Sequence, residues 1–292
     1  MKQFCDASVV VPAYNEERVI AACLESLAPY TQEGSHPRLE VVVAANGCHD
    51  RTVEIAREYD VEVLDIPTGS KSLALNAGDA AATALPRIYL DADIVLSNEA
   101  IPALVEALSG PEPLVAAPHV QFDLRGASWP VRAYYRVFRE IPYVTDGLVG
   151  LGVYAVSAAG RARFDRFPDV HADDLFIQRL FAPHERLTTA GTFTVTTPRT
   201  LRSLIDVRVR VARGNTTLAD TDADRFAATT GSTGRALLDL LRRRPTELPS
   251  VLVFLAVTLT ARRRAARPAR EAAAWERDES SRLTPRRKDP SS

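Results

Sequence analysis

Two aspartates, Asp91 and Asp93, stand one residue apart directly after the short apolar run 88–90. Their carboxylates are oxygen ligands of the kind that Mg²⁺ and Mn²⁺ prefer, and a cation held there could also bind a diphosphate. Alternatively, the pair could form an Asx-type turn that caps the strand. A helix is expected from Asn98 through Leu108, so the pair falls at the carboxyl end of a strand, where open α/β sheets bind ligands. This context favours a divalent-cation site.

The elements that must position this pair alternate regularly in the first part of the chain. Short β-branched runs predict buried strands, and apolar residues at helical spacing between them predict helices. The predicted strands are 7–11, 39–44, 61–66 and 87–90, and the predicted helices are 15–27, 50–59 and 70–82. This order predicts a parallel sheet with helices on both faces.

The pattern is looser after residue 110. The predicted strands are 114–123 and 188–196, an extended segment is expected at 147–156, and the predicted helices are 129–140, 173–181 and 199–213. A Thr/Asp/Gly-rich loop is expected at 214–234, two apolar runs lie between arginine clusters in 237–266, and 276–292 is expected to be a disordered tail.

Composition limits the class of protein. The chain has 292 residues, 46% of them hydrophobic and 25% charged, and a formal net charge of −1. These values are typical of a soluble globular protein and argue against a nucleic-acid partner. Three cysteines with no CxxC spacing argue against disulfides and zinc, and for a reducing compartment. No signal peptide is recognisable, so a cytoplasmic location is expected.

Four stretches in order carry a family resemblance. They are residues 9–16 (VVVPAYNE), 46–52 (NGCHDRT), 69–78 (GSKSLALNAG) and 91–93 (DAD). In sequence and spacing they resemble the family 2 glycosyltransferases, many of them bacterial and inverting. The resemblance implies an α/β GT-A fold, that of the nucleotide-diphospho-sugar transferases. In this fold a mostly parallel central sheet is flanked by helices, here with a C-terminal helical extension.

The resemblance also implies donor-binding residues in the first motif. Pro12, Ala13 and Tyr14 would shape the nucleotide cleft, and Glu16 would face the ribose or base. Glu16 could instead be a first-turn helix carboxylate favoured by the helix dipole.

Three more residues are donor-site candidates. Asn46 stands where the family usually has the Asp that reads uracil; its amide can still pair with a base edge, although it could simply be a left-handed turn residue before a glycine. Lys71 can offer a charge to a phosphate or order the site, or it can be solvated. Arg213, in the RVARG stretch 210–214, sits where processive members carry Gln-x-x-Arg-Trp; it could reach the diphosphate or belong to a solvated helix face.

An acidic pair, Asp173 and Asp174, resembles the family's Glu-Asp at a helix start. Mutual repulsion raises one pKa of such a pair, which suits a general base. We assign Asp174 as the base and Asp173 as its support; an ordinary helix N-cap is the alternative. The glycine-containing stretch 147–154 resembles the family's acceptor strand, where a sugar can approach the backbone.

Together these features predict a glycosyltransferase that uses Mn²⁺ or Mg²⁺, held by Asp93 and Asp91. The resemblance implies that the transfer inverts the anomeric centre. The donor would be a nucleoside-diphosphate sugar, UDP-linked, and the acceptor a hydroxyl of a sugar, a lipid-linked or a small molecule. A nucleotidyltransferase and a non-catalytic sugar-nucleotide or membrane-binding module are the alternatives. A nucleotidyltransferase would need a loop rich in glycine and basic residues after its first strand. Residues 12–16 contain neither glycine nor a basic residue. The expected division is 1–110 for the donor, 111–214 for the acceptor and catalysis, and 215–275 for the helical extension.

Residues 251–261 are largely apolar and lie between the arginine triplets 242–244 and 262–264. They are too few to span a bilayer, which takes about twenty residues. Residues 242–292 carry a net charge of +7, against −8 in the rest of the chain. The stretch could pack in the core, or it could lie in a membrane interface, with 242–270 making a peripheral contact at the inner face of the membrane.

Overall fold

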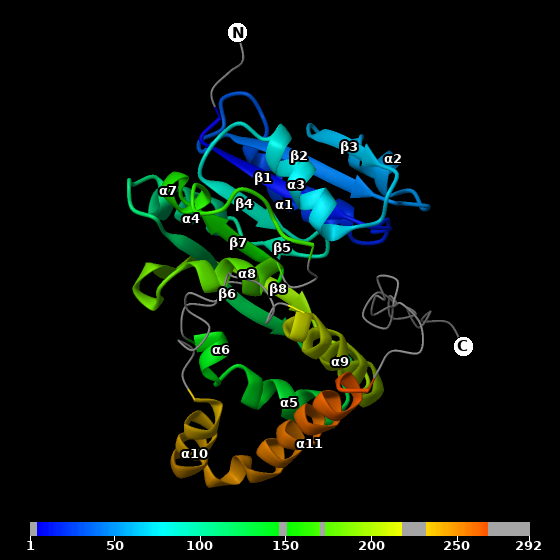
Figure 1. Cartoon of the computed structure of the whole chain (residues 1–292), viewed down its shortest axis with the longest axis vertical. Helices are drawn as coiled ribbons and strands as arrows, with labels where there is room; N and C mark the ends of the chain where they lie inside the picture. The colour runs from blue at the N-terminus through cyan, green and yellow to red at the C-terminus, as the bar shows by residue number, and fades with distance from the viewer. Residues whose placement is uncertain (1–4, 146–150, 170–172, 218–231, 268–292) are drawn as a thin grey trace, which may run out of the picture.

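The computed structural model describes residues 5–145, 151–169, 173–217 and 232–267. The eight strands found in these ranges form one mixed sheet in the order β3-β2-β1-β4-β7-β6-β8-β5. Figure 1 shows the sheet in the upper part of the molecule and the C-terminal helices below it.

The first half of the chain forms the parallel part of the sheet. Strand β1 pairs in parallel with β2 and β4, and β2 pairs in parallel with β3. The elements are β1 (Ala7–Ala13), α1 (Ile20–Leu27), β2 (Leu39–Asn46), α2 (Thr52–Ala56), β3 (Glu62–Ile66), α3 (Lys71–Ala81) and β4 (Arg87–Leu90), with a 3-10 turn at Ala28–Tyr30. The predicted βαβαβαβ order is confirmed here.

The second half adds strands of both directions. Strand β7 is antiparallel to β4 and β6, whereas β8 is parallel to β6 and antiparallel to β5. The elements are β5 (Val95–Leu96), α4 (Ala100–Leu108), β6 (Val115–Asp123), α5 (Trp129–Phe138), α6 (Pro142–Thr145), β7 (Val153–Val156), α7 (Ala158–Arg161), α8 (Asp173–Leu180), β8 (Arg186–Thr196) and α9 (Leu201–Thr217). The sheet is therefore mixed, and its continuous parallel part is formed by β1, β2, β3 and β4 of the first half.

Helices cover both faces of the sheet because the strand side chains alternate in direction. Val9 and Val11 of β1 belong to a core shared with α1 and α4. Val10 points to the other face, into a core shared with α3 and α8. The carboxyl ends of β1, β2 and β4 are thereby held between two packed layers.

A third core joins α5 and α9 to the C-terminal helices α10 (Thr233–Arg243) and α11 (Leu248–Ala265). A 3-10 turn at Pro245–Glu247 connects α10 to α11, and a separate 3-10 turn at Pro183–Glu185 precedes β8. Tyr134 of α5 stacks on Phe254 of α11 at 5.1 Å between ring centroids. Val251, Phe254 and Val257 are buried in this core. One face of the apolar stretch 251–261 therefore packs inside the protein, as one of the two interpretations predicts.

Several helix limits differ from those expected. Helix α1 begins at Ile20 and not near residue 15, because Asn15 has a φ of 51° and the amides of Val19 and Ile20 both donate to the Glu16 carbonyl in a turn. Helix α2 is only Thr52–Ala56. Helix α9 runs to Thr217 and so crosses the expected boundary at 214/215. The expected tail 276–292, most of the loop 214–234 and residues 147–150 lie outside the described ranges.

Candidate active site

The lysine at the start of α3 bridges the two halves of the site. Ser70 caps this helix, its hydroxyl accepting from the Leu73 amide, so Lys71 stands in the first turn. The Lys71 Nζ lies 2.9 Å from Asp91 Oδ1 and 2.9 Å from Asp173 Oδ1. Burial opposes the charged amine, but the carboxylates of Asp173 and Asp91 raise its pKa above the ordinary value. Lys71 is therefore a fixed cation between two acidic motifs that are far apart in sequence.

Asp173 has both carboxylate oxygens engaged. Its Oδ1 faces Lys71, and its Oδ2 accepts a 2.9 Å hydrogen bond from the Tyr154 hydroxyl of β7. The side chain is only 7% exposed, and it begins α8, where the helix dipole favours negative charge. Asp173 is thus a buried, fully bonded carboxylate, well placed to support its neighbour.

Asp174 differs from Asp173 in its surroundings. It is partly exposed, and its Oδ1 accepts from the Leu175 amide at 2.7 Å. Burial, and next the negative charge of Asp173, raise the pKa of Asp174 to about 6. Burial and then the charge of Asp174 also raise the pKa of Tyr143, so this phenol is a neighbour that sequence reasoning missed. A reachable carboxylate with a pKa near neutrality is suited to general-base catalysis.

The Asp91–Asp93 motif lies directly after β4, as predicted. Burial raises the pKa of Asp91 to about 6, although the Lys71 charge opposes this. Asp93 is exposed. Beneath them is the buried Cys23, whose thiol pKa is raised by burial and then by the charges of Asp93, Asp91 and Glu16. The carboxylates of Asp93, Asp91 and Glu16 therefore all lie near the Cys23 thiol.

Glycine is required where β7 approaches this motif. Gly152 has a φ of +107°, and a Cβ there would lie 2.7 Å from Ile94 and 3.5 Å from the Asp91 carboxylate. Its carbonyl accepts from the Asp91 amide at 2.7 Å. Gly152 thus makes room for the Asp91 turn itself.

The oxygen ligands at this site are compatible with a divalent cation that is bound together with a substrate. Within the described ranges, no group of three or more His, Cys, Asp or Glu side chains is arranged to hold a metal. Mg²⁺ and similar ions are commonly held by one or two carboxylates, with substrate phosphates and water completing the shell. Asp91 and Asp93, with the exposed oxygens of the latter, fit that arrangement.

The other donor-site candidates lie at the ends of β1 and β2. Pro12 and Ala13 are the buried last residues of β1, and Tyr14 follows them, its ring edge 3.2 Å from where a Cβ on Gly69 would lie. The structure therefore places Tyr14 against the loop that leads to Lys71.

Asn46 is completely buried at the end of β2. Its amide donates to the Ala13 carbonyl at 2.8 Å, and its oxygen accepts from the Ser70 amide at 3.0 Å. These bonds hold the loop before α3 against β1, so a contact with a base through this side chain would require breaking them. Asn46 therefore links the end of β1 to the start of α3.

Glu16 is buried beside the 46–52 loop. Its amide donates to the Thr52 hydroxyl at 2.6 Å, and Asp50 accepts from the Glu17 amide at 3.2 Å. The two loops expected to bind the donor are thus joined to each other. Arg213 is half-buried on α9, and its reach to a diphosphate stays a prediction.

Sequence reasoning missed a polar stripe on α3. Ser72, Asn76 and Asp79 have helical spacing on an otherwise Ala- and Leu-rich helix, and that was the available signal. Ser72 donates to Asp169 at 2.8 Å, and Asn76 makes two hydrogen bonds with the backbone of Phe167, at 3.0 and 2.8 Å. These contacts fasten the segment that leads to Asp173 onto the helix that carries Lys71.

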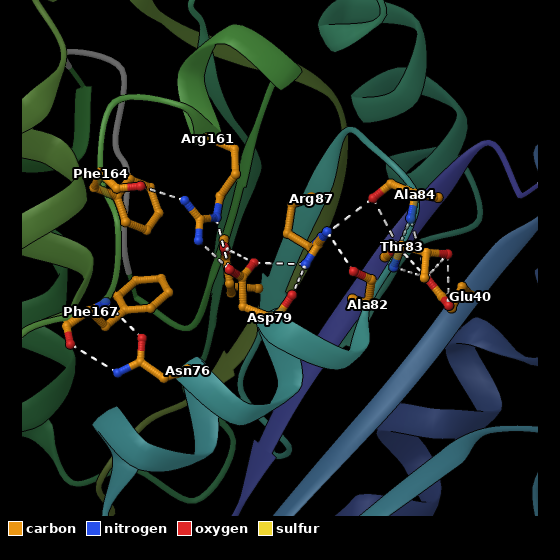
Figure 2. A network of polar contacts seen from close by, with 12 residues as sticks. Glu40, Asn76, Asp79, Ala82, Thr83, Ala84, Arg87, Arg161, Phe164 and Phe167 are labelled. Carbon is orange, nitrogen blue, oxygen red and sulfur yellow. Dashed lines mark hydrogen bonds and ion pairs between the residues drawn. The ribbon is translucent and has the colours of Figure 1, made fainter.

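Figure 2 shows the far end of this stripe. Asp79 receives hydrogen bonds from Arg87 of β4 at 2.7 Å, from Tyr89 at 2.7 Å and from the Nε of Arg161 at 2.9 Å. Although burial works against it, hydrogen bonds from Arg161 and Tyr89 lower the pKa of Asp79. The network fixes α3 against both halves of the sheet.

Comparison with known proteins identifies the family of this chain. The family model for glycosyl transferase family 2 matches residues 8–166. The glycosyltransferase YibD of Escherichia coli K12, itself uncharacterized, is 30% identical over 153 residues, half of this chain and 40% of YibD. The 4,4'-diaponeurosporenoate glycosyltransferase of Staphylococcus haemolyticus is 32% identical over 108 residues, 34% of this chain and 28% of that protein. The chain thus matches less than half the length of either relative.

Solved structures show the same fold. A mannosyltransferase from Pyrobaculum calidifontis, in complex with GDP-Man and Mn²⁺, aligns with a TM-score of 0.62 at 20% identity, over 90% of this chain and 88% of that one. The glucosyl-3-phosphoglycerate synthase of Mycobacterium tuberculosis, with Mn²⁺, UDP and glucosyl-3-phosphoglycerate, aligns with a TM-score of 0.50 at 21% identity, over 73% and 78% of the two chains. The expected GT-A fold is confirmed. Since the family model spans more than half of its residues, this chain belongs to glycosyl transferase family 2.

Proposed function

We propose that the protein transfers a sugar, with inversion, from a UDP-linked donor to the hydroxyl of a sugar, a lipid-linked or a small-molecule acceptor. The observation that carries the proposal is the double contact of Lys71 with Asp91 and Asp173. It joins the carboxylates suited to a diphosphate-bound cation to the pair suited to proton removal. Fold relatives solved with GDP-Man or UDP and with Mn²⁺ support a nucleotide-sugar donor.

Asp93 and Asp91 would hold Mn²⁺ or Mg²⁺. When bound, the ion would neutralise the charge that develops on the leaving diphosphate. Lys71 holds the Asp91 side chain in place, and Tyr14 and Glu16 lie on the loop expected to face the nucleotide. Arg213 is a second candidate for the diphosphate.

Asp174 acts as the base. Its carboxylate takes the proton of the acceptor hydroxyl while that oxygen attacks the anomeric carbon on the side opposite the leaving group, and this in-line attack inverts the centre. Asp173 is a positioning residue: its negative charge keeps the pKa of Asp174 high, and Lys71 and Tyr154 hold it in place. The proposal also includes a peripheral contact with a membrane through residues 242–270.

A donor panel tests the proposal. UDP-glucose, UDP-N-acetylglucosamine, GDP-mannose and dTDP-glucose are incubated with the protein and Mn²⁺, and the released nucleoside diphosphate is measured with and without EDTA. We expect release from a UDP-sugar that EDTA abolishes. Preference for GDP- or dTDP-sugars would overturn the UDP assignment, and neither binding nor release with any donor would overturn the transferase proposal.

A further inference from the structure

The exposed residues of α11 are all apolar over a stretch of fourteen residues. Residues 248–261 contain no charged side chain. Six of them are exposed, and all six are apolar: Leu248, Pro249, Leu252, Leu255, Ala256 and Leu259. A helix that packs one face on a core normally presents polar residues to water on the other. This helix is apolar on both faces, so its outer face is built for something other than water.

The four exposed leucines form one continuous stripe. Their spacing of four, three and four residues keeps Leu248, Leu252, Leu255 and Leu259 on one side of the helix. The stripe is about 17 Å long, at about 1.5 Å of rise per residue. The leucines are 39–58% exposed, whereas Val251, Phe254 and Val257 on the opposite side are at most 5% exposed. The inner face of α11 packs on α5 and α9, whereas the leucine stripe is exposed.

Exposed arginines stand at both ends of the stripe. Residues 262–264 form the last turn of α11, and 242–244 end α10 just before it. Residues 242–267 contain seven arginines and one glutamate, so they carry nearly all of the +7 excess of the C-terminal region. The basic charge therefore lies beside the apolar stripe.

This charge pattern decides between two possible occupants. If a second copy covered the stripe in an antiparallel arrangement, the triplet 262–264 of one copy would meet 242–244 of the other. In a parallel arrangement each triplet would meet itself. Both pairings place like charges together, which is unfavourable. An anionic surface with an apolar interior complements the arginines and the leucines at once.

We propose that the leucine stripe of α11 inserts into the interface of an anionic lipid bilayer, with α11 lying along the surface and the arginines at 242–244 and 262–264 on the headgroups. Among the described helices, none is long and apolar enough to cross a membrane. Figure 1 shows α10 and α11 at the end of the molecule opposite β2 and β3. This inference rests on the membrane contact of the proposed function and specifies which residues make it. It does not depend on sugar transfer.

Vesicle flotation of the full-length protein tests the surface. The vesicles are phosphatidylcholine alone, or phosphatidylcholine with 30% phosphatidylglycerol, at low and high salt. We expect binding to the anionic vesicles that weakens at high salt and is absent from the neutral ones. Arg262→Gln/Arg263→Gln should weaken partitioning about 25-fold, at about fivefold per arginine. Leu252→Gln/Leu259→Gln should weaken it at least about tenfold while the charge stays unchanged.

Matched controls place the same changes in the opposite half of the protein. Arg51→Gln/Arg57→Gln removes two exposed arginines, and Leu85→Gln alters an exposed leucine; neither should change vesicle binding. The proposal would be overturned if the wild type did not bind anionic vesicles at low salt, or if Leu252→Gln/Leu259→Gln bound them as well as the wild type does. It would also be overturned if Arg51→Gln/Arg57→Gln bound the vesicles as weakly as Arg262→Gln/Arg263→Gln does. A dimer in sedimentation that Leu252→Gln/Leu259→Gln dissociates would overturn it as well. Donor hydrolysis without vesicles, measured on the two α11 variants, is expected to stay unchanged, so failure here is distinguishable from failure of the transferase proposal.

Discussion

Lys71 Nζ lies 2.9 Å from Asp173 Oδ1, so the first turn of α3 is tied to the first turn of α8 across 102 positions of sequence. Both side chains are largely buried, at 19% and 7% exposure. The pair connects the half that carries Asp91 with the half that carries Asp174. The site therefore depends on a contact that neither half can form alone.

Replacing Lys71 should damage both stability and turnover. Lys71→Met leaves the buried Asp173 carboxylate without its cation, and we expect a loss of about 3 kcal/mol in the free energy of unfolding, as for a broken buried pair. Lys71→Met/Asp173→Asn removes the stranded charge and should recover part of that stability but none of the donor turnover. Urea unfolding and nucleotide release measure the two effects. A double variant no more stable than Lys71→Met would contradict this account.

The pH dependence follows from Asp174. A base must be deprotonated, and the pKa of Asp174 is raised to about 6, so kcat should fall about tenfold per unit as the pH drops below 6. The same group has the opposite effect on stability: because the folded state holds the proton more tightly, its contribution to stability increases as the pH falls through 6 towards the unfolded value. Asp174→Asn should therefore raise the melting temperature at pH 7.5. A wild-type kcat that stays flat down to pH 5 would argue against the assignment.

Removal of the cation ligand should stop the reaction. Asp93→Ala takes away an exposed carboxylate from the end of β4 without disturbing the core, so folding should be unchanged while turnover with Mn²⁺ is lost. Glu99→Ala, an exposed acidic residue six positions later, is the control and should remain active. Turnover of wild type that survives EDTA would rule out the metal requirement.

The Asp79 network should be a large contributor to stability. Asp79→Asn leaves the guanidinium groups of Arg87 and Arg161 without a buried counter-charge, which should cost about 3–5 kcal/mol. The pKa of Asp79 is lowered in the fold, so its contribution is present above the unfolded pKa and is lost as the pH falls through the folded value. Asp65→Asn, at an exposed position of β3, should change the stability by less than about 0.5 kcal/mol. Equal midpoints in urea for the two variants would refute this role.

The sequence allowed the first half of the fold to be predicted because each strand is a short β-branched run and each connection is a helix. The position of Asp91 and Asp93 at the end of β4, and that of Lys71 at the start of the helix after β3, followed from that order. The antiparallel direction of β7 could not be predicted, because the strand follows α5 and α6 and nothing local fixes the direction in which the chain returns to the sheet.

Contacts between distant residues were also beyond prediction. The ion pair of Lys71 with Asp173 and the hydrogen bonds of Asn76 with Phe167 depend on where α8 packs. The local sequence pattern does not encode that position. Asn46 shows a different limit: its residue type suits a base contact, but its burial and its two backbone partners appear only in the structure. For α11 the sequence showed an apolar stretch but could not assign its two faces.

The most direct test compares Asp174→Asn with Asp173→Asn and wild type, measuring donor affinity by calorimetry and sugar transfer by product formation. The account predicts that Asp174→Asn keeps the donor Kd within about threefold while transfer falls by about 10²–10⁴-fold, since the amide keeps its size but cannot take a proton. Near-normal transfer by Asp174→Asn, together with loss in Asp173→Asn, would contradict Asp174 as the base.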